Sequence, residues 1–381
     1  MTRWQLLVSA LEDTARLLLI ELLKTYSPTN REKPAVEVLE KYAWSLGYED
    51  VHVDRVGNLI AHYGSGDETV AFVGHIDTVD GELPVSVDRG IVTGRGAVDA
   101  KGPLAAMFVG VAMAKGVVDP SKWRIYAIAA VGEEGDSRGA RELVRSGFSA
   151  NGVVVAEPSN TRFVVIGYRG SLKVEITCSS RRGHASSPSF EMSACEKLIC
   201  LWSTIRSTCS SFSAHGNSAT LLYLSCGSST AQSVYPSEGR MLIDVRVSVN
   251  GRANSVLEEL VKAVNRLGCT VKIIDSAPPV KVSPNAPIVR ATMRSLLMQG
   301  VKPRLTYKLG TSDMNLLHPL SGGNIVAYGP GKSELSHGEF EAISLEELFF
   351  GVRIYRDIIL NYVKLTERAS KTQATTFYYR F

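Results

Sequence analysis

A histidine and an aspartate follow one of the most apolar runs of the sequence. His75 comes directly after the apolar residues 70–74, and Asp77 stands two residues further on. In an extended backbone, side chains two residues apart point to the same side, so Asp77 can approach the ring of His75. A metal-ligating histidine usually has its second ring nitrogen held by such an acceptor. The pair therefore predicts a metal ligand with an orienting carboxylate; the alternative is a histidine at a strand end beside a capping aspartate.

Further carboxylate and imidazole groups follow apolar segments or lie in glycine-rich loops. They are Asp99 within residues 94–102, Glu133 and Glu134 after residues 125–131, Glu157 after residues 153–155, and His337 after residues 329–331. Taken alone, Asp99 could cap a helix, and Glu133 with Glu134 could form the acidic first turn of one. Adjacent carboxylates at the end of a buried strand repel each other unless a cation is present. Together with His75, the set predicts zinc or a similar divalent ion, with two ions sharing one carboxylate as a known hydrolytic arrangement.

Alternating strand and helix patterns indicate the layers that position these side chains. Apolar spacing predicts helices over residues 6–25, 32–46, 101–115, 138–146, 288–299 and 344–366, and strands over residues 58–63, 70–74, 123–131 and 152–155. This order predicts an α/β fold with a mostly parallel sheet, whose strand carboxyl ends are where sites form. The last dozen residues show no clear pattern.

A second, smaller domain is predicted within the first. Residues 179–233 are rich in Ser, Thr and Cys, and strands are expected over residues 172–177, 241–249 and 270–274, with a helix over residues 254–267. This pattern suggests an α+β sandwich of the ferredoxin-like kind. Residues 276–287 contain four prolines and are expected to be the linker that returns to the first domain. We therefore predict a discontinuous catalytic domain of residues 1–169 and 276–381, and an inserted domain of residues 170–275.

The composition excludes several classes of protein. Of 381 residues, 45% are hydrophobic and 21% are charged, which is typical of a globular protein rather than a disordered or collagen-like one. The 42 basic and 38 acidic residues are too balanced for a protein that binds nucleic acid through phosphates. Charged residues interrupt the apolar residues 1–23, so neither a membrane span nor an export signal is expected. The six cysteines are sparse and form no C-x-x-C pair, which predicts free thiols and a cytoplasmic location.

At the level of motifs, the chain resembles the co-catalytic metallopeptidase and deacylase family M20, over nearly its whole length. The family includes succinyl-diaminopimelate desuccinylase, acetylornithine deacetylase and carboxypeptidase G2. The resemblance is carried by Gly74-His75-Ile76-Asp77-Thr78-Val79, by Gly94-Arg95-Gly96 with Asp99-Ala100-Lys101-Gly102, and by Gly132-Glu133-Glu134-Gly135. It implies a metal-dependent hydrolase that cleaves a linear amide bond, with a parallel-sheet catalytic domain.

The resemblance implies a role for each matched residue of the metal site. His75 and Glu157 would bind one zinc ion, Glu134 and His337 a second, and Asp99 would bridge them. Asp77 would orient His75, and Glu133 would act as general base. Two Zn²⁺ ions per subunit are expected, with Co²⁺ as the alternative metal. The family also often has a cis peptide bond after the bridging carboxylate, here Asp99-Ala100.

The inserted domain would be a lid through which the protein forms a homodimer, again by resemblance. His184 would contact a substrate carbonyl in the site of the other subunit. Arg246 would bind a substrate carboxylate with its forked guanidinium, although a solvent-facing strand residue is the alternative. The substrate loop near the metals would be Gly310-Thr311-Ser312-Asp313.

Within the family, the chain resembles the hydrolases that release lysine or ornithine from an amino-group carrier protein. The matching segments are residues 98–107, 310–315 and 327–331. The partner would be a small acidic protein that holds the amino acid on its terminal glutamate, in lysine and arginine biosynthesis. Arg169, Arg181 and Arg182 would accommodate it. The sequence departs from the pattern of these hydrolases in two places: Ser336 stands where they have an acidic residue, and residues 203–233 have no counterpart in them. The substrate therefore stays open between the carrier conjugate and a small acylated amino acid or peptide.

Two other classes of function compete with this interpretation. The segment Gly135-Asp136-Ser137-Arg138-Gly139 matches the G-x-S-x-G motif of serine hydrolases, and Asp313 and His337 follow in the right order. A serine mechanism would leave His75, Asp99, Glu133 and Glu134 without a role. A non-catalytic binding protein of the same fold would be expected to have lost a ligand or Glu133, and all of these residues are present.

Overall fold

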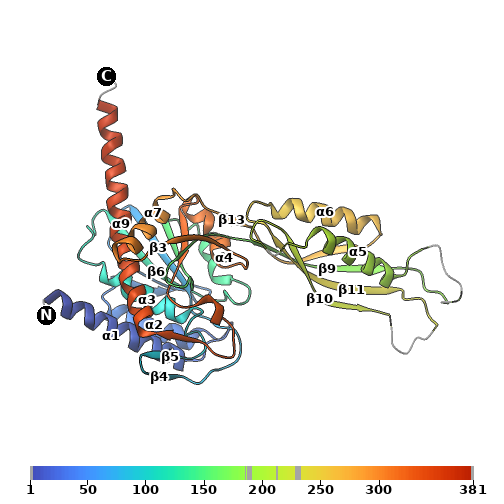
Figure 1. Cartoon of the computed structure of the whole chain (residues 1–381), viewed down its shortest axis with the longest axis horizontal. Helices are drawn as coiled ribbons and strands as arrows, with labels where there is room; N and C mark the ends of the chain where they lie inside the picture. Colours follow the sequence, from blue (N-terminus) through green and yellow to red (C-terminus); the bar gives the residue numbers. More distant parts are fainter. Residues whose placement is uncertain (1–2, 185, 187–190, 212, 228–232, 379–381) are drawn as a thin grey trace. The chain divides into compact units, whose positions relative to one another are not determined.

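The computed structural model describes residues 3–184, 186, 191–211, 213–227 and 233–378. The chain forms two compact units (Figure 1): unit 1 is Met1–Ile166, Val282–Thr306 and Leu316–Phe381, and unit 2 is Gly167–Lys281 and Tyr307–Asn315. Compared with the boundaries expected from the sequence, unit 2 is longer by a few residues at each end. It also takes in Tyr307–Asn315, which is not part of the predicted insertion.

The largest sheet has nine strands and is parallel at its centre. In spatial order its strands are β1 (Asp50–Val53), β2 (Leu59–Tyr63), β6 (Trp123–Ala130), β3 (Glu68–His75), β7 (Gly152–Ala156), β15 (Ile325–Tyr328), β8 (Phe163–Tyr168) and β13 (Val280–Lys281), and β14 (Arg304–Lys308) pairs with β8. Strands β6, β3, β7 and β15 run parallel to one another. All five residues of β7 and six of the eight residues of β3 are buried, as expected for strands covered on both faces. The predicted α/β fold with a mostly parallel sheet is confirmed.

Helices cover this sheet, and one of them is buried on every side. The helices are α1 (Arg3–Lys24), α2 (Lys33–Ser45), α3 (Lys101–Met113), α4 (Arg138–Arg145), α7 (Pro287–Met298), α8 (Met314–Leu317) and α9 (Leu345–Tyr378). All residues of α3 are buried, and the helix packs against β3, β6 and α9. Its lack of a polar face follows from that position. Helix α9 continues to Tyr378, so the absence of a pattern in the last dozen residues did not mean an absence of helix.

Unit 2 contains a four-stranded sheet with two helices on one face (Figure 1). Its elements are β9 (Gly170–Ser179), α5 (Ala194–Thr208), β10 (Ser218–Cys226), β11 (Glu238–Val247), α6 (Ala253–Arg266) and β12 (Thr270–Ala277), and the strand order is β10-β11-β9-β12. Alternate residues of β9 and β11 pack against α5 and α6 to form one apolar core. This strand order, with both helices on one face of the sheet, is that of the expected ferredoxin-like α+β domain.

The Ser- and Cys-rich stretch contains two elements that the sequence did not predict. Helix α5 begins with a capping box, in which the Ser193 hydroxyl accepts from the Glu196 N–H and the Glu196 carboxylate accepts from the Ser193 N–H. Strand β10 then pairs with β11. Residues 212 and 228–232 of this stretch, and Ala185 and residues 187–190 around the predicted His184 motif, lie outside the described residues.

The expectation of free thiols is wrong for four of the six cysteines. Cys178 forms a disulfide with Cys269, and Cys195 forms one with Cys226. The first bond joins the end of β9 to the start of the neighbouring strand β12, and its cysteines are 91 residues apart. Spacing alone cannot reveal such pairs, because only the strand pairing brings them together. Cys200 and Cys209 are free thiols, and the cysteine content therefore no longer argues for a reducing compartment.

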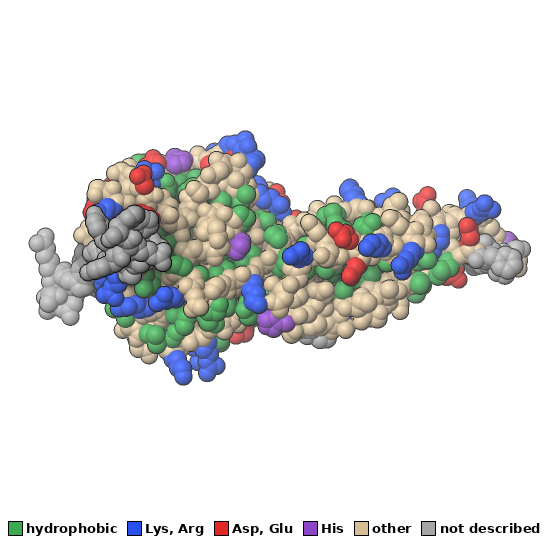
Figure 2. Space-filling view, turned by 90° about the horizontal axis from the view of Figure 1, so that it is seen from above, with side chains coloured by type: hydrophobic (Ala, Val, Ile, Leu, Met, Phe, Trp, Pro, Cys, Tyr) green, Lys and Arg blue, Asp and Glu red, His purple; other side chains and the backbone are tan. Residues whose placement is uncertain are grey.

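Charged side chains of both signs are interleaved on the face shown in Figure 2, in line with the nearly balanced composition.

A small third sheet completes unit 1, with the order β16 (Ala342–Ser344), β5 (Ile91–Thr93) and β4 (Ser86–Asp88). Among the described residues, no helix has the length and apolar character that crossing a membrane requires.

Candidate metal centre

The four parallel strands of the central sheet each end close to a predicted ligand. Strand β3 ends at His75, β7 is followed by Glu157, β6 leads into Glu133 and Glu134, and β15 leads into the loop of His337. Asp99 lies just before α3, and the predicted cis peptide bond between Asp99 and Ala100 is present. The carboxyl ends of parallel strands meet at one edge of a sheet, which explains why ligands from distant parts of the chain converge there.

The predicted ligands form two groups that share Asp99. Ligand atoms of His75, Asp99 and Glu157 all lie within 4.8 Å of one another, and so do those of Asp99, Glu134 and His337. The two oxygens of Asp99 face different histidines: Oδ1 lies 3.2 Å from His75 Nε2, and Oδ2 lies 3.3 Å from His337 Nε2. This is the arrangement that a carboxylate bridging two ions requires.

The groups differ in exposure. The side chain of His75 is 1% exposed, whereas that of His337 is 48% exposed. His337 Nε2 also lies 2.7 Å from Glu134 Oε1. We call the group of His75, Asp99 and Glu157 the inner group, and the group of Asp99, Glu134 and His337 the outer group.

The ring of His75 is oriented for binding through Nε2. Its Nδ1 lies 3.0 Å from the backbone carbonyl oxygen of Asp77, which can only accept a hydrogen bond. Nδ1 therefore carries the proton and donates, and Nε2, facing Asp99, keeps a lone pair when the ring is neutral. The Asp77 carboxylate is further away, with Oδ1 at 3.6 Å from Nδ1. The predicted orienting role of that carboxylate stays a prediction, since the main chain of the same residue supplies the closer acceptor.

The carboxylate of Asp77 holds the turn that carries the two adjacent glutamates. Oδ1 accepts a hydrogen bond from the Glu133 N–H at 3.1 Å, and Oδ2 accepts one from the Glu134 N–H at 3.1 Å. Thr29 donates its hydroxyl to Oδ2 at 2.7 Å. Thr29 was not predicted, and no local pattern marks it, because it lies 48 residues before its partner. The buried Asp77 thus connects His75 to the Glu133–Glu134 turn through both its main chain and its side chain.

Protonation in the metal-free protein follows from the crowding of these groups. Burial acts to raise the pKa of Asp99, but hydrogen bonds from His337 and His75 outweigh it and hold that pKa far below its usual value. Hydrogen bonds to Asp99 and Glu134 raise the pKa of His337 to about 10. Burial acts to lower the pKa of His75, yet its bonds to Asp77 and Asp99 raise it well above the ordinary value. Protonated histidines thus balance the carboxylates, and a metal ion would replace those protons.

The donor set fits divalent metal ions. It consists of two imidazole nitrogens and three carboxylates, with the sharing of Asp99 giving each group three ligands. Zinc and its neighbours accept this mixture of nitrogen and oxygen ligands, and three protein ligands leave a position for water or substrate. A side-chain oxygen of Glu133 lies within 4.8 Å of ligand atoms of His75 and Glu134, so these three residues form a third set of possible ligands, and Glu133 lies next to one residue of each of the two groups.

Unit 2 brings together part of the predicted substrate-binding set. Arg246 on β11 donates from Nη1 to the Thr311 hydroxyl at 3.3 Å, and from Nη2 to Asp244 Oδ2 at 2.8 Å. Ser312 is buried, and its N–H donates to the side-chain oxygen of Asn315 at 2.9 Å. Gly310 precedes Thr311 in the same loop. The loop 310–313 and Arg246 therefore lie together, and Arg246 is not a freely solvated strand residue.

His184 is exposed, and one of its two ring nitrogens contacts Ser186. Its Nδ1 accepts a hydrogen bond from the Ser186 N–H at 3.2 Å and lies 2.6 Å from the Ser186 hydroxyl. Because a backbone N–H only donates, Nδ1 is the unprotonated nitrogen and Nε2 carries the proton. In this tautomer the Nε2–H is a donor suited to a carbonyl oxygen. Ser186 was not predicted to act on His184.

Arg169 does not lie on the surface as a carrier-binding residue would. It is 7% exposed, and its guanidinium donates to the Leu309 carbonyl at 2.8 Å and to the Ser218 hydroxyl at 2.9 Å. The expectation that Arg169 accommodates an acidic partner is therefore wrong. Its part is to hold the loop that contains Thr311.

The serine-nucleophile alternative receives no support from the geometry. Strand β6 ends at Ala130, whereas Ser137 precedes α4 at the far end of an intervening turn. A nucleophile elbow places its serine on the sharp turn directly after the strand. The ring of His337 is engaged by Glu134 and Asp99 instead.

Comparison with known proteins points to one family. Residues 71–361 match the profile of peptidase family M20/M25/M40. The LysW-lysine/LysW-ornithine hydrolases of Sulfurisphaera tokodaii and Saccharolobus solfataricus are 34% and 33% identical to this chain, each over 90% of it and 94% of the relative. An aminopeptidase from Bacillus cereus has a similar structure, with a TM-score of 0.77 at 23% identity over 92% of this chain and 99% of that one. A dinuclear metal-binding peptidase from Bacillus subtilis also has a similar structure, with a TM-score of 0.70 at 14% identity over 94% of this chain and 99% of that one.

Proposed function

Because this chain belongs to peptidase family M20/M25/M40, we propose that it hydrolyses an amide bond with the help of two metal ions held by the inner and outer groups. The observation that carries the proposal is the sharing of Asp99, whose two oxygens face one histidine of each group. Two Zn²⁺ ions per subunit are proposed, with Co²⁺ as the alternative. Metal analysis of the purified protein, before and after treatment with a chelator, would test the number and the identity of the ions.

Glu133 is proposed as the general base. Bound ions would lower the pKa of a water molecule and polarise the carbonyl group of the substrate. The carboxylate of Glu133 would take a proton from that water and later give it to the leaving amine nitrogen. Its position beside His75 and Glu134, with its own N–H held by Asp77, supports this role. Asp77 is proposed to keep His75 and the Glu133–Glu134 turn in place.

Unit 2 is proposed to bind the substrate. The Nε2–H of His184 would donate to the substrate carbonyl oxygen as negative charge develops there, in the active site of the other subunit. Arg246, Gly310, Thr311 and Ser312 would bind the carboxylate of the released amino acid. The pairing of Arg246 with Thr311 supports this assignment, because it places the guanidinium on β11 next to a hydroxyl group of the loop 310–313.

The proposed substrate is lysine or ornithine attached to the terminal glutamate of an acidic amino-group carrier protein. The names of the two relatives, which match this chain over 90% of its length, support the choice. The product would enter lysine or arginine biosynthesis, and a cytoplasmic location is proposed on that ground. The alternative is a deacylase for N-acetylornithine or N-succinyl-diaminopimelate, or a metallo-carboxypeptidase.

A homodimer formed through unit 2 is also proposed. Strand β10 lies at an edge of the four-stranded sheet, and three of its apolar residues are exposed: Leu222 to 49%, Tyr223 to 56% and Leu224 to 41% of their surface. An edge strand with exposed apolar side chains is a surface that a second copy can cover. Light scattering should give twice the chain mass for the native protein and the chain mass for Tyr223→Lys; a monomeric native protein would contradict the proposal.

Substrate and base can be tested in one experiment. The metal-loaded protein is given carrier-linked lysine, carrier-linked ornithine, N-acetylornithine and N-succinyl-diaminopimelate, and release of the free amino acid is measured. We expect turnover of the carrier conjugates and a loss of at least about 10²-fold in Glu133→Gln. Asp136→Asn, an exposed carboxylate just after the same turn, is the matched control and should keep full activity. Preference for a small acylated amino acid would overturn the carrier assignment, and an active Glu133→Gln would overturn the mechanism.

A further inference from the structure

Glu341 is a buried carboxylate that has no part in the proposed reaction. It lies between His337 and β16 and is 1% exposed. Its Oε1 accepts a hydrogen bond from Arg95 Nη1 at 2.7 Å. Its Oε2 accepts from three backbone N–H groups, those of Gly96 at 3.0 Å, Val98 at 3.3 Å and Asp99 at 3.4 Å. A buried charge needs such compensation, and here the donors come from the loop that carries Asp99.

Arg95 connects the same loop to the segment of His337. Its Nη1 also donates to the Gly338 carbonyl at 3.0 Å, and its Nε donates to the Gly81 carbonyl at 2.8 Å. Arg95 and Glu341 are 246 residues apart in the sequence. Their contact therefore joins residues 94–99 to residues 337–341, and each of these segments supplies one ligand of the outer group.

The backbone on both sides of this contact needs to be held. Gly96 has a φ of +90°, and a Cβ atom there would lie 2.9 Å from Thr78 Cγ2, so the loop conformation requires glycine. His337 has a φ of +62°, a conformation that residues other than glycine adopt when their surroundings impose it. The Gly94 N–H donates to the Glu341 carbonyl at 3.2 Å, and β16 pairs with β5 directly afterwards. Glu341 thus lies where the two segments are brought into register.

We propose that Glu341 and Arg95 are positioning residues that set the separation between Asp99 and His337, and through it the affinity of the outer group for its metal ion. The inference rests on the proposed function, because it assumes that the outer group binds a metal. In the inner group, His75 ends β3 and Glu157 follows β7, so the central sheet holds these two ligands without help from Glu341, and only the shared Asp99 lies on a joined segment. In the outer group, both Asp99 and His337 lie on the joined segments. Losing the Arg95–Glu341 contact should therefore weaken the outer site more than the inner one.

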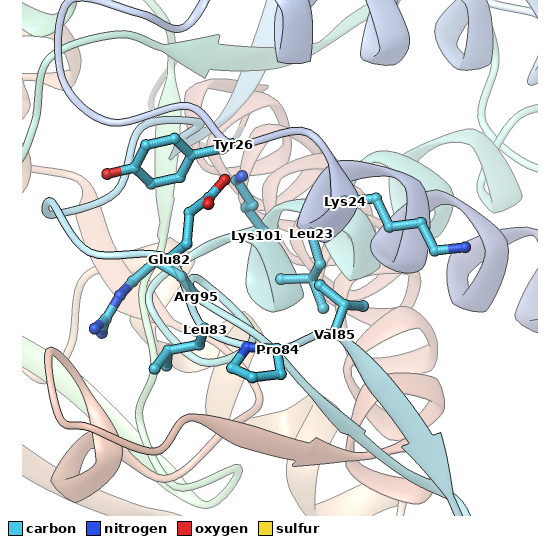
Figure 3. A pocket seen from close by; sticks show the side chains of 9 residues that line it. All are labelled: Leu23, Lys24, Tyr26, Glu82, Leu83, Pro84, Val85, Arg95 and Lys101. Carbon is cyan, nitrogen blue, oxygen red and sulfur yellow. The ribbon is translucent and has the colours of Figure 1, made fainter.

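Arg95 can also be reached from outside. It lines a cavity of about 500 Å³ together with Tyr26, Glu82 and Lys101, among others (Figure 3). The cavity is larger than a guanidinium ion. Added guanidinium can therefore occupy the place of the missing group when Arg95 is shortened, which gives the proposal a chemical test.

The test is calorimetric titration of the metal-free protein with Zn²⁺, combined with native mass spectrometry to count the bound ions. The native protein is expected to bind two ions. Glu341→Gln should weaken the second binding step by about 10- to 100-fold, the range typical for residues that support metal ligands, and the first step by less than about threefold. Glu339→Gln, an exposed carboxylate two residues away, is the matched control and should titrate like the native protein.

Arg95→Ala provides an independent variant. It should show the same selective loss, and millimolar guanidinium should restore the second step, which a general structural defect would not allow. Equal weakening of both steps, or an unchanged titration of both variants, would overturn the proposal. If Glu341→Gln does not fold, the guanidinium response of Arg95→Ala decides. A native protein that binds two ions but hydrolyses no carrier conjugate would refute the proposed substrate and leave this inference standing.

Discussion

The carboxylate of Asp77 allows a quantitative test of how the Glu133–Glu134 turn is held. In Asp77→Asn, one carboxylate oxygen becomes an amide group that donates and cannot accept. Two backbone N–H groups and the Thr29 hydroxyl then compete for a single neutral oxygen. A hydrogen bond to a charged group contributes about 1.5–3 kcal/mol, so losing or misdirecting two of them should lower the free energy of unfolding by about 3–6 kcal/mol.

Thr29→Val separates one of these contacts from the others. It removes the hydroxyl donor at 2.7 Å and leaves both backbone bonds to Asp77, so we expect a loss of about 1.5 kcal/mol. The double variant should cost little more than Asp77→Asn alone, because the Thr29 contact depends on the carboxylate. Urea unfolding of the metal-free proteins at neutral pH measures all three values. A loss below about 1 kcal/mol for Asp77→Asn, or full additivity in the double variant, would refute the reasoning.

The pH dependence gives a second check with a definite sign. Burial acts to raise the pKa of Asp77, but the charge of the nearby His75 and hydrogen bonds from the Thr29 hydroxyl and the Glu134 N–H hold that pKa below its usual value. The unfolded chain therefore binds the proton more readily, and the stability due to the ionised Asp77 is present above a pH of about 4 and lost as the pH falls through the lower native pKa. The difference between the native protein and Asp77→Asn should shrink at acid pH. A difference that grows below pH ~4 would contradict the assignment.

Three further predictions concern other parts of the chain. Replacing Cys178 and Cys269 by alanine should lower the free energy of unfolding by up to about 4–5 kcal/mol, because the bond closes a separation of 91 residues. Urea unfolding of the native protein with reductant should show at least as large a loss, since reductant also opens the Cys195–Cys226 bond, and no loss would count against the prediction. Burial raises the pKa of Tyr362 to about 12, so the native state keeps a proton that the unfolded chain releases, and the free energy of unfolding should fall as the pH rises above about 10. Circular dichroism combined with tyrosinate absorbance measures this, and a constant free energy of unfolding up to pH ~12 would contradict the prediction. Ser186→Ala should lower kcat about fivefold at an unchanged KM, since it removes one hydrogen bond to His184; Ser186→Thr is the control, and a change in KM alone would argue against an orienting role.

The residues that converge in the candidate metal centre could be predicted because most of them belong to a local pattern. His75 ends an apolar strand, Glu157 directly follows one, and the Glu133–Glu134 pair comes shortly after another. The parallel sheet then brings those strand ends to one edge. The ordering of helices and strands in unit 1 is likewise a local signal. The resemblance to a family added the assignment of particular residues to particular ions.

What could not be predicted depends on contacts between distant residues. Glu341 stands in an unremarkable polar segment, and only its contact with Arg95 across 246 residues shows that it is buried and charged for a reason. Thr29 and Asp77, and Cys178 and Cys269, are further pairs of this kind. The orientation of His75 was also beyond the sequence, because the closer acceptor is the carbonyl of Asp77 and every residue has a carbonyl.

Unit 2 is built from two separate segments of the chain, and this restricts how it could be exchanged or studied on its own. The segment Tyr307–Asn315 packs with Gly167–Lys281, although unit 1 residues flank it on both sides in the sequence. Its Asn315 donates from Nδ2 to the carbonyls of Arg169 at 3.0 Å and Pro278 at 2.7 Å. A fragment cut at the ends of the inserted domain would leave those carbonyls without their donor. Grafting this unit from one relative to another therefore requires two pieces of chain. Recombination at a single pair of breakpoints would separate the loop 310–313 from the residues that hold it.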